Sequence, residues 1–251
     1  MSGTLTGRTA LVTGSGAGIG LAIAHRYAAE GARVIVADRD GTAAAAAVDG
    51  MATARSVVMD ISDEESVRSA FGALRSSGWS PDVVVANAGV QLFGHDARVA
   101  DLELETWRRT IDVNLTGTFL TLKYAVQGML ELGGGSVIVI GSPTALNGEG
   151  AEFTAYSASK AGMHGMTRAI AAAYAGRNVR ANVIVPAYTE TGLVAAIVDD
   201  AESRDAIIGR IPLGRPGAPD DVAAMATFLA SDDAAFATGA VFRVDGGMTT
   251  L

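Results

Sequence analysis

Thr9-Ala-Leu-Val-Thr-Gly-Ser-Gly-Ala-Gly-Ile-Gly20 passes from a short apolar run straight into four closely spaced glycines. The run 9–13 predicts a buried strand, and the alanine-rich stretch that follows predicts a helix over 18–30. Glycines at such a turn let the backbone approach a pyrophosphate, and the free N–H groups that begin the helix favour an anion. The spacing is T-G-x-x-x-G-x-G, with Ile19 where the usual G-x-G-x-x-G has its last glycine. The stretch therefore predicts nucleotide binding at the end of a first strand.

Outward from this turn, short apolar runs alternate with longer helix-period stretches along the whole chain. Strands are predicted over 9–13, 33–38, 55–60, 82–86, 136–141, 180–185 and 241–244, and helices over 18–30, 63–76, 103–132, 154–176 and 219–230. This alternation is typical of an α/β fold, a doubly wound, Rossmann-like parallel sheet of seven strands with helices on both faces. No linker divides residues 1–251, so we expect a single domain. The segment 188–211 breaks the alternation and is predicted to be a substrate lid.

Composition excludes several classes of function. The 251 residues carry a net charge of −8 and no lysine- or arginine-rich block, which argues against nucleic-acid and anionic-membrane partners. No uninterrupted apolar segment is long enough to span a membrane, and the N-terminus does not resemble a signal peptide. The absence of cysteine excludes disulfides and thiolate chemistry, and the histidines at 25, 95 and 164 lack metal-ligand spacing. We expect a cytoplasmic protein without a metal.

Asp38 ends the second predicted strand, eighteen residues after Gly20. A carboxylate at this position can accept hydrogen bonds from an adenosine ribose and repels a 2′-phosphate, which favours NAD over NADP. Ser15 and Ala17 in the turn offer no cation for that phosphate. Arg39 can stack on adenine or reach a 2′-phosphate, so NADP stays open.

Tyr156 and Lys160 lie four residues apart in a predicted helix, on one face and one turn from each other. A phenol has a pKa near ~10 in water and is a poor base at neutral pH. A neighbouring ammonium favours the phenolate and is predicted to lower that pKa, which makes a candidate proton-transfer group. The same spacing occurs by chance on many solvated helix faces, so the pair alone does not decide the function.

Over residues 5–250 the chain resembles the short-chain dehydrogenase/reductase family, in its shorter one-domain branch. The matching elements are the loop Thr13–Gly20, Asp60-Ile61, Asn87-Ala88-Gly89, Asn114, Ser142, the Tyr156-x-x-x-Lys160 pair, Pro186 to Thr191, and Asp245-Gly246-Gly247. Two departures stand out. Ala187 replaces the usual glycine after Pro186, and Ser142 lies fourteen residues before Tyr156, one more than expected. We prefer Ser142 to Thr144 as the family's serine because it directly follows the apolar strand.

The resemblance implies a role for each catalytic residue. Tyr156 would exchange a proton with the substrate oxygen, while Lys160 would lower its pKa and hold the nicotinamide ribose. Ser142 would orient the substrate oxygen, and Asn114 would fix a helix kink and a water that links Lys160 to solvent. The implied cofactor contacts are Gly14, Ser15, Gly18, Ile19, Gly20, Asp38, Arg39, Asp60, Ile61, Asn87, Ala88, Gly89, Tyr156, Lys160, Pro186, Thr189 and Thr191.

The implied activity is hydride transfer between NAD(H) and a secondary alcohol or ketone, which is a polyol, a sugar, a hydroxy acid or a cyclic alcohol. Residues 91–96, 143–153 and 188–211 are expected to form the substrate site. An NADPH-dependent 3-oxoacyl thioester reductase is an alternative, against which Asp38 argues. A non-catalytic NAD-binding sensor is another, although all four implied catalytic residues are present. The family commonly forms tetramers through the long helices, so we expect a homotetramer.

Overall fold

The computed structural model describes residues 3–148, 150–192 and 201–250 and contains one sheet of seven parallel strands. The strands are β1 (Thr9–Thr13), β2 (Arg33–Asp38), β3 (Ala54–Val58), β4 (Val83–Ala86), β5 (Gly135–Ile140), β6 (Val179–Pro186) and β7 (Val241–Val244). Their order is β3-β2-β1-β4-β5-β6-β7, and every neighbouring pair is parallel. The predicted doubly wound α/β fold is confirmed.

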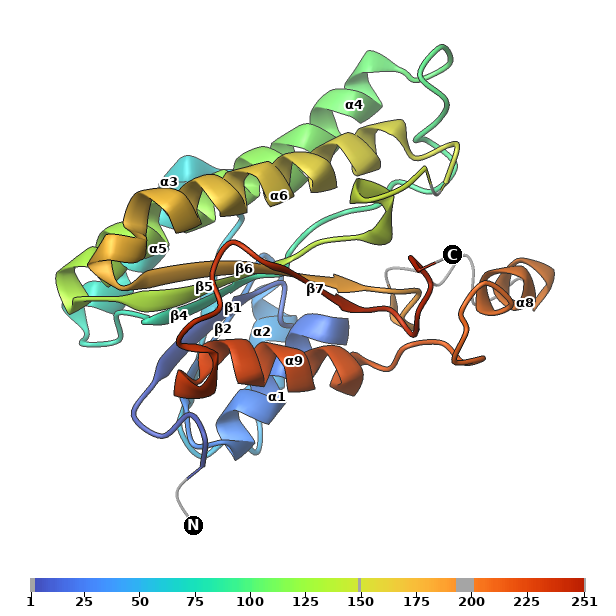
Figure 1. Ribbon diagram of the computed structural model, residues 1–251. Coiled ribbons are helices and arrows are strands. Elements are labelled where there is room, and N and C mark those ends of the chain that lie inside the picture. Colours follow the sequence, from blue (N-terminus) through green and yellow to red (C-terminus); the bar gives the residue numbers. More distant parts are fainter. Residues whose placement is uncertain (1–2, 149, 193–200, 251) are drawn as a thin grey trace.

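Helices cover both faces of the sheet (Figure 1). One layer holds α3 (Glu64–Ser76), α4 (Leu104–Thr110), α5 (Gly117–Leu132) and α6 (Thr154–Tyr174), and the other holds α1 (Gly18–Ala29), α2 (Gly41–Ala47) and α9 (Pro219–Ala230). Short α8 (Ala201–Ile208) lies beyond the carboxyl ends of the strands. No helix among the described residues is both long and apolar enough to cross a bilayer.

Two sequence-based expectations need correction. Residues 104–132 are helical, close to the predicted range of 103–132, but Ile111–Thr116 within them form a π-helix. Helix α2 was not predicted at all. Its seven residues are mostly alanine, and the side chain of Asp40 caps its start by accepting hydrogen bonds from the N–H groups of Thr42 and Ala43.

The central strands bury both faces, which is why they are nearly continuous apolar runs. All five residues of β1 are buried. Leu11 packs into the core beneath α3, α5 and α6, whereas its neighbours Ala10 and Val12 pack into the opposite core with α1 and α9. Because side chains alternate between the two faces of the sheet, each central strand contributes residues to both cores. This alternation also fixes the register of the central strands.

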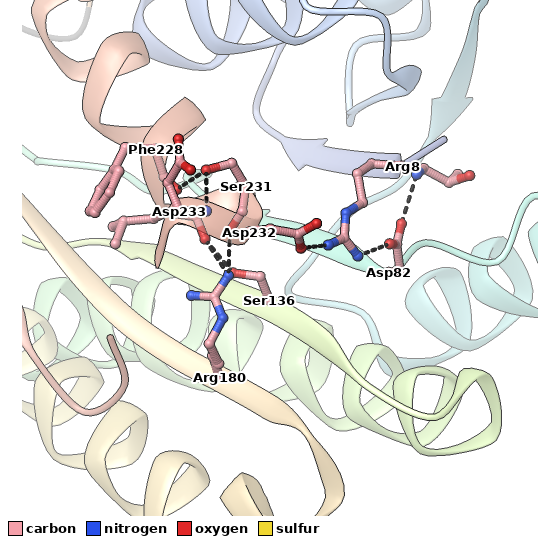
Figure 2. Close-up of polar contacts among 10 residues, drawn as sticks. Arg8, Asp82, Ser136, Arg180, Phe228, Ser231, Asp232 and Asp233 are labelled. Atoms are coloured by element: carbon pink, nitrogen blue, oxygen red, sulfur yellow. Dashed lines mark hydrogen bonds and ion pairs between the residues drawn. The ribbon is translucent and has the colours of Figure 1, made fainter. Parts of the chain in front are cut away.

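The amino edge of the sheet is closed by a polar network (Figure 2). The half-buried guanidinium of Arg180 on β6 donates to the carbonyl oxygens of Leu229 at 2.8 Å and Ser231 at 3.2 Å, where α9 ends. The hydroxyl of Ser136 on β5 donates to the same Leu229 oxygen at 2.9 Å. Cations and donors at a helix C-terminus satisfy its last carbonyls and favour its dipole, so this network fixes α9 on the sheet.

We expect Arg180→Met to lower the free energy of unfolding by about 2 kcal/mol, because it leaves half-buried carbonyl oxygens without their charged donor. Urea denaturation followed by circular dichroism measures the change. The matched control is Arg177→Met, which removes an exposed arginine nearby and should change stability by less than about 0.5 kcal/mol. Equal stability of Arg180→Met and the wild type would show that water replaces the guanidinium.

Candidate active site

The glycine turn after β1 brings backbone against backbone. Gly14 has a φ of +61°, and a Cβ there would lie 2.8 Å from the Cα of Ala88. A Cβ on Gly20 would lie 2.4 Å from the carbonyl oxygen of Gly14. Ala17, which precedes α1, gives no side-chain cap to the helix N–H groups. The turn therefore combines a close backbone approach with uncapped donors, as a phosphate site needs.

A cavity of about 330 Å³ lies over this turn at the carboxyl ends of the strands. Most of the predicted cofactor residues line it, namely Gly14, Gly18, Ile19, Asp38, Arg39, Asp60, Ile61, Asn87, Ala88, Gly89 and Thr191. Sequence reasoning missed Met59, Ser62, Val90 and Val113, which also line it. Each of these four residues lies directly beside a residue of a predicted motif and completes the wall there.

Asp38 and Asp60 place carboxylates at the far end of this cavity. Asp38 accepts a hydrogen bond from the N–H of Gly16 at 3.0 Å, and a Cβ on Gly16 would lie 2.9 Å from the same carboxylate oxygen. The hydroxyl and N–H of Ser62 donate to Asp60 and hold the pKa of that carboxyl below its usual value, with Arg39 as a weaker cause. The pattern of glycine turn, uncapped helix and strand-end carboxylate fits the pyrophosphate and ribose of a dinucleotide.

Ser15 faces the other way. It is fully buried, and its hydroxyl donates to the carbonyl oxygen of Val12 at 2.6 Å and accepts from the N–H of Ala37 at 3.2 Å. It does not line either cavity described here. Its side chain fastens the turn to β2 instead of reaching the space above it.

Asn87 joins the ends of β4 and β1. Its side-chain amide donates to the carbonyl oxygens of Thr13 and Gly14 at 3.0 and 3.1 Å. In return the hydroxyl oxygen of Thr13 accepts from the N–H groups of Asn87 and Ala88, both at 3.0 Å. Asn87-Ala88-Gly89 is thereby held against the glycine turn.

A second cavity, of about 240 Å³, adjoins the first and shares Ile19, Asn87, Gly89 and Thr191 with it. It contains the predicted residues Ser142, Tyr156, Lys160, Pro186 and Thr189. Of the predicted substrate segments, Gln91, Pro143, Thr144, Gly150, Phe153, Tyr188, Ile207 and Arg210 line it. Residues 193–200 of the predicted lid lie outside the described residues.

Tyr156 is buried in this second cavity and interacts with the hydroxyl of Ser142. The hydroxyl of Ser142 lies 3.0 Å from that of Thr144, so the two are neighbours, but Ser142 is the one that acts on the pKa of the phenol. Burial raises the pKa of Tyr156 to about 12, and the Ser142 hydrogen bond opposes this only in part. The phenol is therefore protonated at neutral pH.

Lys160 does not act on Tyr156 as predicted. Its Nζ donates to the carbonyl oxygen of Ile140 at 2.8 Å and lies 5.6 Å from the centre of the Tyr156 ring. Burial lowers the pKa of Lys160 to about 8. The pKa of Tyr156 is raised in this structure and not lowered as predicted, because burial of the phenol is the largest cause and Lys160 is not among the causes.

Asn114 lies in the π-helical turn and reaches neither cavity. Its side chain accepts from the N–H of Val90 at 2.7 Å and donates to the carbonyl oxygen of Val90 at 2.9 Å. It also lies 3.2 Å from the hydroxyl of Ser159, to which it donates. The predicted distortion of the helix is present, and Asn114 connects it to the strand-end loop and to α6.

Two buried polar atoms near the second cavity have no hydrogen-bond partner among the described residues, the Tyr188 hydroxyl and His164 Nε2. Burial and the charges of Lys160 and Arg168 lower the pKa of His164 to about 4, so its imidazole is neutral. Tyr188 lines the cavity itself.

The chain matches known proteins over nearly its whole length. A family model described as Enoyl-(Acyl carrier protein) reductase matches residues 14–249. The cis-4-hydroxycyclohexanecarboxylate dehydrogenase of Sinomonas cyclohexanicum is 38% identical over 97% of this chain and 97% of its own. The 3-oxoacyl-[acyl-carrier-protein] reductase FabG of Escherichia coli is 35% identical, over 96% and 97%.

A solved structure agrees with these relatives. The gluconate 5-dehydrogenase of Burkholderia cenocepacia, in complex with NADP and tartrate, superposes with a TM-score of 0.93 at 34% identity, covering 98% of this chain and 97% of that one. The chain therefore belongs to the short-chain dehydrogenase/reductase family and is an oxidoreductase that acts on CH–OH groups with a nicotinamide cofactor.

Proposed function

We propose that this protein transfers a hydride between NAD(H) and a small polar secondary alcohol or its ketone, with Tyr156 as the proton-transfer group. The observation that carries this proposal is the buried Tyr156–Ser142 pair in a cavity that adjoins the cavity over the glycine turn. A substrate oxygen beside both hydroxyls would lie next to the nicotinamide end of a dinucleotide. Proximity of this kind is how a protein assists hydride chemistry that belongs to the cofactor.

In the direction of ketone reduction, a bound nicotinamide would supply the hydride that the carbonyl carbon receives. Tyr156 donates its hydroxyl proton to the carbonyl oxygen, and Ser142 donates a hydrogen bond to the same oxygen. A phenol with a pKa of about 12 holds that proton at neutral pH, so the resting site is already in the form that reduction needs. Alcohol oxidation runs through the same atoms in reverse and requires the phenolate.

Lys160 and Asn114 support this exchange in the proposal. Lys160 lines the second cavity together with Tyr156 and is the cation that would hold the nicotinamide ribose. A pKa of about 8 lets it pass a proton near neutral pH. Asn114 keeps Val90 and Ser159 in place, and we assign it to the route by which Lys160 exchanges protons with water.

The substrate is proposed to be small and polar. A cavity of about 240 Å³ lies below the usual range for drug-sized ligands, and Gln91, Thr144, Tyr188 and Arg210 add polar groups to its lining. One relative acts by name on an alcohol of this kind, the cyclic hydroxy acid cis-4-hydroxycyclohexanecarboxylate. The FabG relative supports a second candidate, NADPH-dependent reduction of a 3-oxoacyl thioester. Asp38 argues against that candidate. A non-catalytic sensor is less well supported, because the complete Ser142, Tyr156 and Lys160 set lines the cavity.

We expect NADH formation from at least one member of a panel of polyols, sugars, hydroxy acids and cyclic secondary alcohols. With that substrate, Tyr156→Phe should lower kcat by about 1,000-fold, in the range of a lost general acid–base group, while NADH still binds in a fluorescence titration. Tyr27→Phe is the control, since it removes a buried phenol hydroxyl bonded to Ala226 on the far side of the sheet. It should keep full turnover. A fully active Tyr156→Phe enzyme would refute the assignment.

We expect the wild type to have a higher kcat/KM with NAD than with NADP, because the Asp38 carboxylate accepts from a ribose and repels a 2′-phosphate. Asp38→Asn keeps an acceptor for Gly16 and removes the charge, so the NAD-to-NADP ratio should fall by about tenfold or more. Asp40→Asn, two residues away and outside the cavity, controls for net charge. If Asp40→Asn lowers the NAD-to-NADP ratio equally, the preference for NAD does not depend on contact between the Asp38 carboxylate and the ribose.

We also propose the homotetramer expected from the long helices. Phe119 on α5 is an apolar side chain that is 48% exposed, as a residue of such an interface would be in a single chain. Four chains of 25.5 kDa have a mass of about 102 kDa (4 × 25.5), which light scattering at micromolar concentration measures. A monomer mass would contradict this proposal. The cytoplasmic location expected from the sequence stays a prediction.

A further inference from the structure

Asp96 is a buried carboxylate that the proposed chemistry does not use. It lies in the loop after β4, only 7% exposed, and it lines neither cavity. Its two oxygens accept hydrogen bonds from the N–H groups of Ala155 at 3.0 Å and Tyr156 at 2.9 Å. These are backbone donors in the first turn of α6, nearly sixty residues further along the chain.

Helix α6 has no cap of its own. Phe153 occupies the N-cap position, and its side chain cannot accept a hydrogen bond. The second and third helical residues, Ala155 and Tyr156, are the ones whose N–H groups an N-cap side chain normally satisfies. Asp96 supplies both acceptors from another segment, and its negative charge lies where the helix dipole favours an anion.

The loop that carries Asp96 is fastened at two further points. Val90 at its start is bonded through both backbone groups to Asn114. Phe93 packs edge-on against Phe153, with ring centres 5.5 Å apart. A turn at Gly94, whose φ is +74°, lets the Asp96 N–H bond to the Leu92 carbonyl oxygen at 2.8 Å. The carboxylate is therefore presented by a restrained loop.

The peptide groups of Tyr156 are held on both sides. Asp96 binds its N–H, and the Ser159 hydroxyl donates to its carbonyl oxygen at 2.7 Å. Asn114 in turn donates to that Ser159 hydroxyl at 3.2 Å. Asn114 and Asp96 thus hold the backbone of Tyr156 through two routes that both begin in the segment 90–96.

We propose that Asp96 is a positioning residue for the reaction, which fixes the first turn of α6 so that the phenol of Tyr156 meets Ser142 and the substrate oxygen. This inference rests on the proposed function of Tyr156. Misplacement of a reacting group by about 1 Å can lower a rate about 100-fold, so a cap that fixes this turn affects turnover more than affinity. Cofactor binding at the glycine turn does not depend on it.

The test compares Asp96→Ala, Asp96→Asn and the wild type in the full-length protein, with the alcohol that the substrate panel identifies. Asp96→Ala should lower kcat by about 10- to 100-fold and leave the NADH dissociation constant within about twofold. Asp96→Asn retains one carbonyl acceptor for the helix and should recover part of that loss. Equal kcat in Asp96→Ala and the wild type would overturn the proposal, as would a loss of NADH affinity as large as the loss of kcat.

A structural control separates positioning from general destabilisation. Asp82→Ala removes another carboxylate that joins two segments, by accepting from the N–H of Thr9 at 2.7 Å and pairing with Arg8 at the opposite edge of the sheet (Figure 2). It should lower the melting temperature and leave kcat unchanged. If Asp82→Ala lowers kcat as much as Asp96→Ala does, the effect of Asp96 is only one of stability.

A double-mutant cycle separates this inference from the proposed function. In a Tyr156→Phe background, Asp96→Ala should change the residual rate by less than about twofold, because it acts through Tyr156. A further tenfold loss in that background would overturn positioning through Tyr156. Full activity of Tyr156→Phe alone would refute the proposed function, whereas an inactive Tyr156→Phe beside a fully active Asp96→Ala would refute only the role of Asp96.

Discussion

The contact between the ends of β1 and β4 is the constraint on which the site depends. Asn87 donates to the carbonyl oxygens of Thr13 and Gly14, and a Cβ on Gly14 would lie only 2.8 Å from the Cα of Ala88. At this point the strand order reverses, so the connections on either side lead to opposite faces of the sheet and leave a crevice between them. Both cavities open from this crevice and share Asn87.

A second constraint is electrostatic and concerns two ionisable groups one helical turn apart. Burial raises the pKa of Tyr156 to about 12 and lowers that of Lys160 to about 8. Both shifts favour the neutral forms, as desolvation requires. The Ser142 hydroxyl opposes the rise in the Tyr156 pKa in part, and the Lys160 ammonium donates to the neutral carbonyl oxygen of Ile140. Burial is the main cause of both pKa shifts, and Lys160 is not among the causes that set the pKa of Tyr156.

The sequence predicted most of the fold, because local pattern and tertiary burial agree there. Strands β1, β2 and β7 have the predicted bounds, since each is an apolar run that polar or glycine residues end. The sequence-based prediction failed where contacts with a residue far along the chain determine the local structure or the orientation of a side chain. A kink at Asn114 was expected, but the bonds between Asn114 and Val90 were not, and the inward orientation of Ser15 depends on Ala37. Asp96 was grouped with the substrate segment, yet it caps α6. Only the lack of a capping residue at Phe153 hinted at an acceptor from elsewhere.

The two cavities differ in what builds them, and this explains why reaction type is easier to infer than substrate. The first cavity is walled largely by residues at the carboxyl ends of β1, β2 and β4, whose positions the sheet fixes. The outer wall of the second comes from loops such as those of Thr144, Gly150 and Tyr188. Loops tolerate substitution without loss of the sheet, so the choice of alcohol can change while hydride transfer persists. Tyr188 belongs to this outer wall, and its buried hydroxyl has no hydrogen-bond partner among the residues that the structure describes.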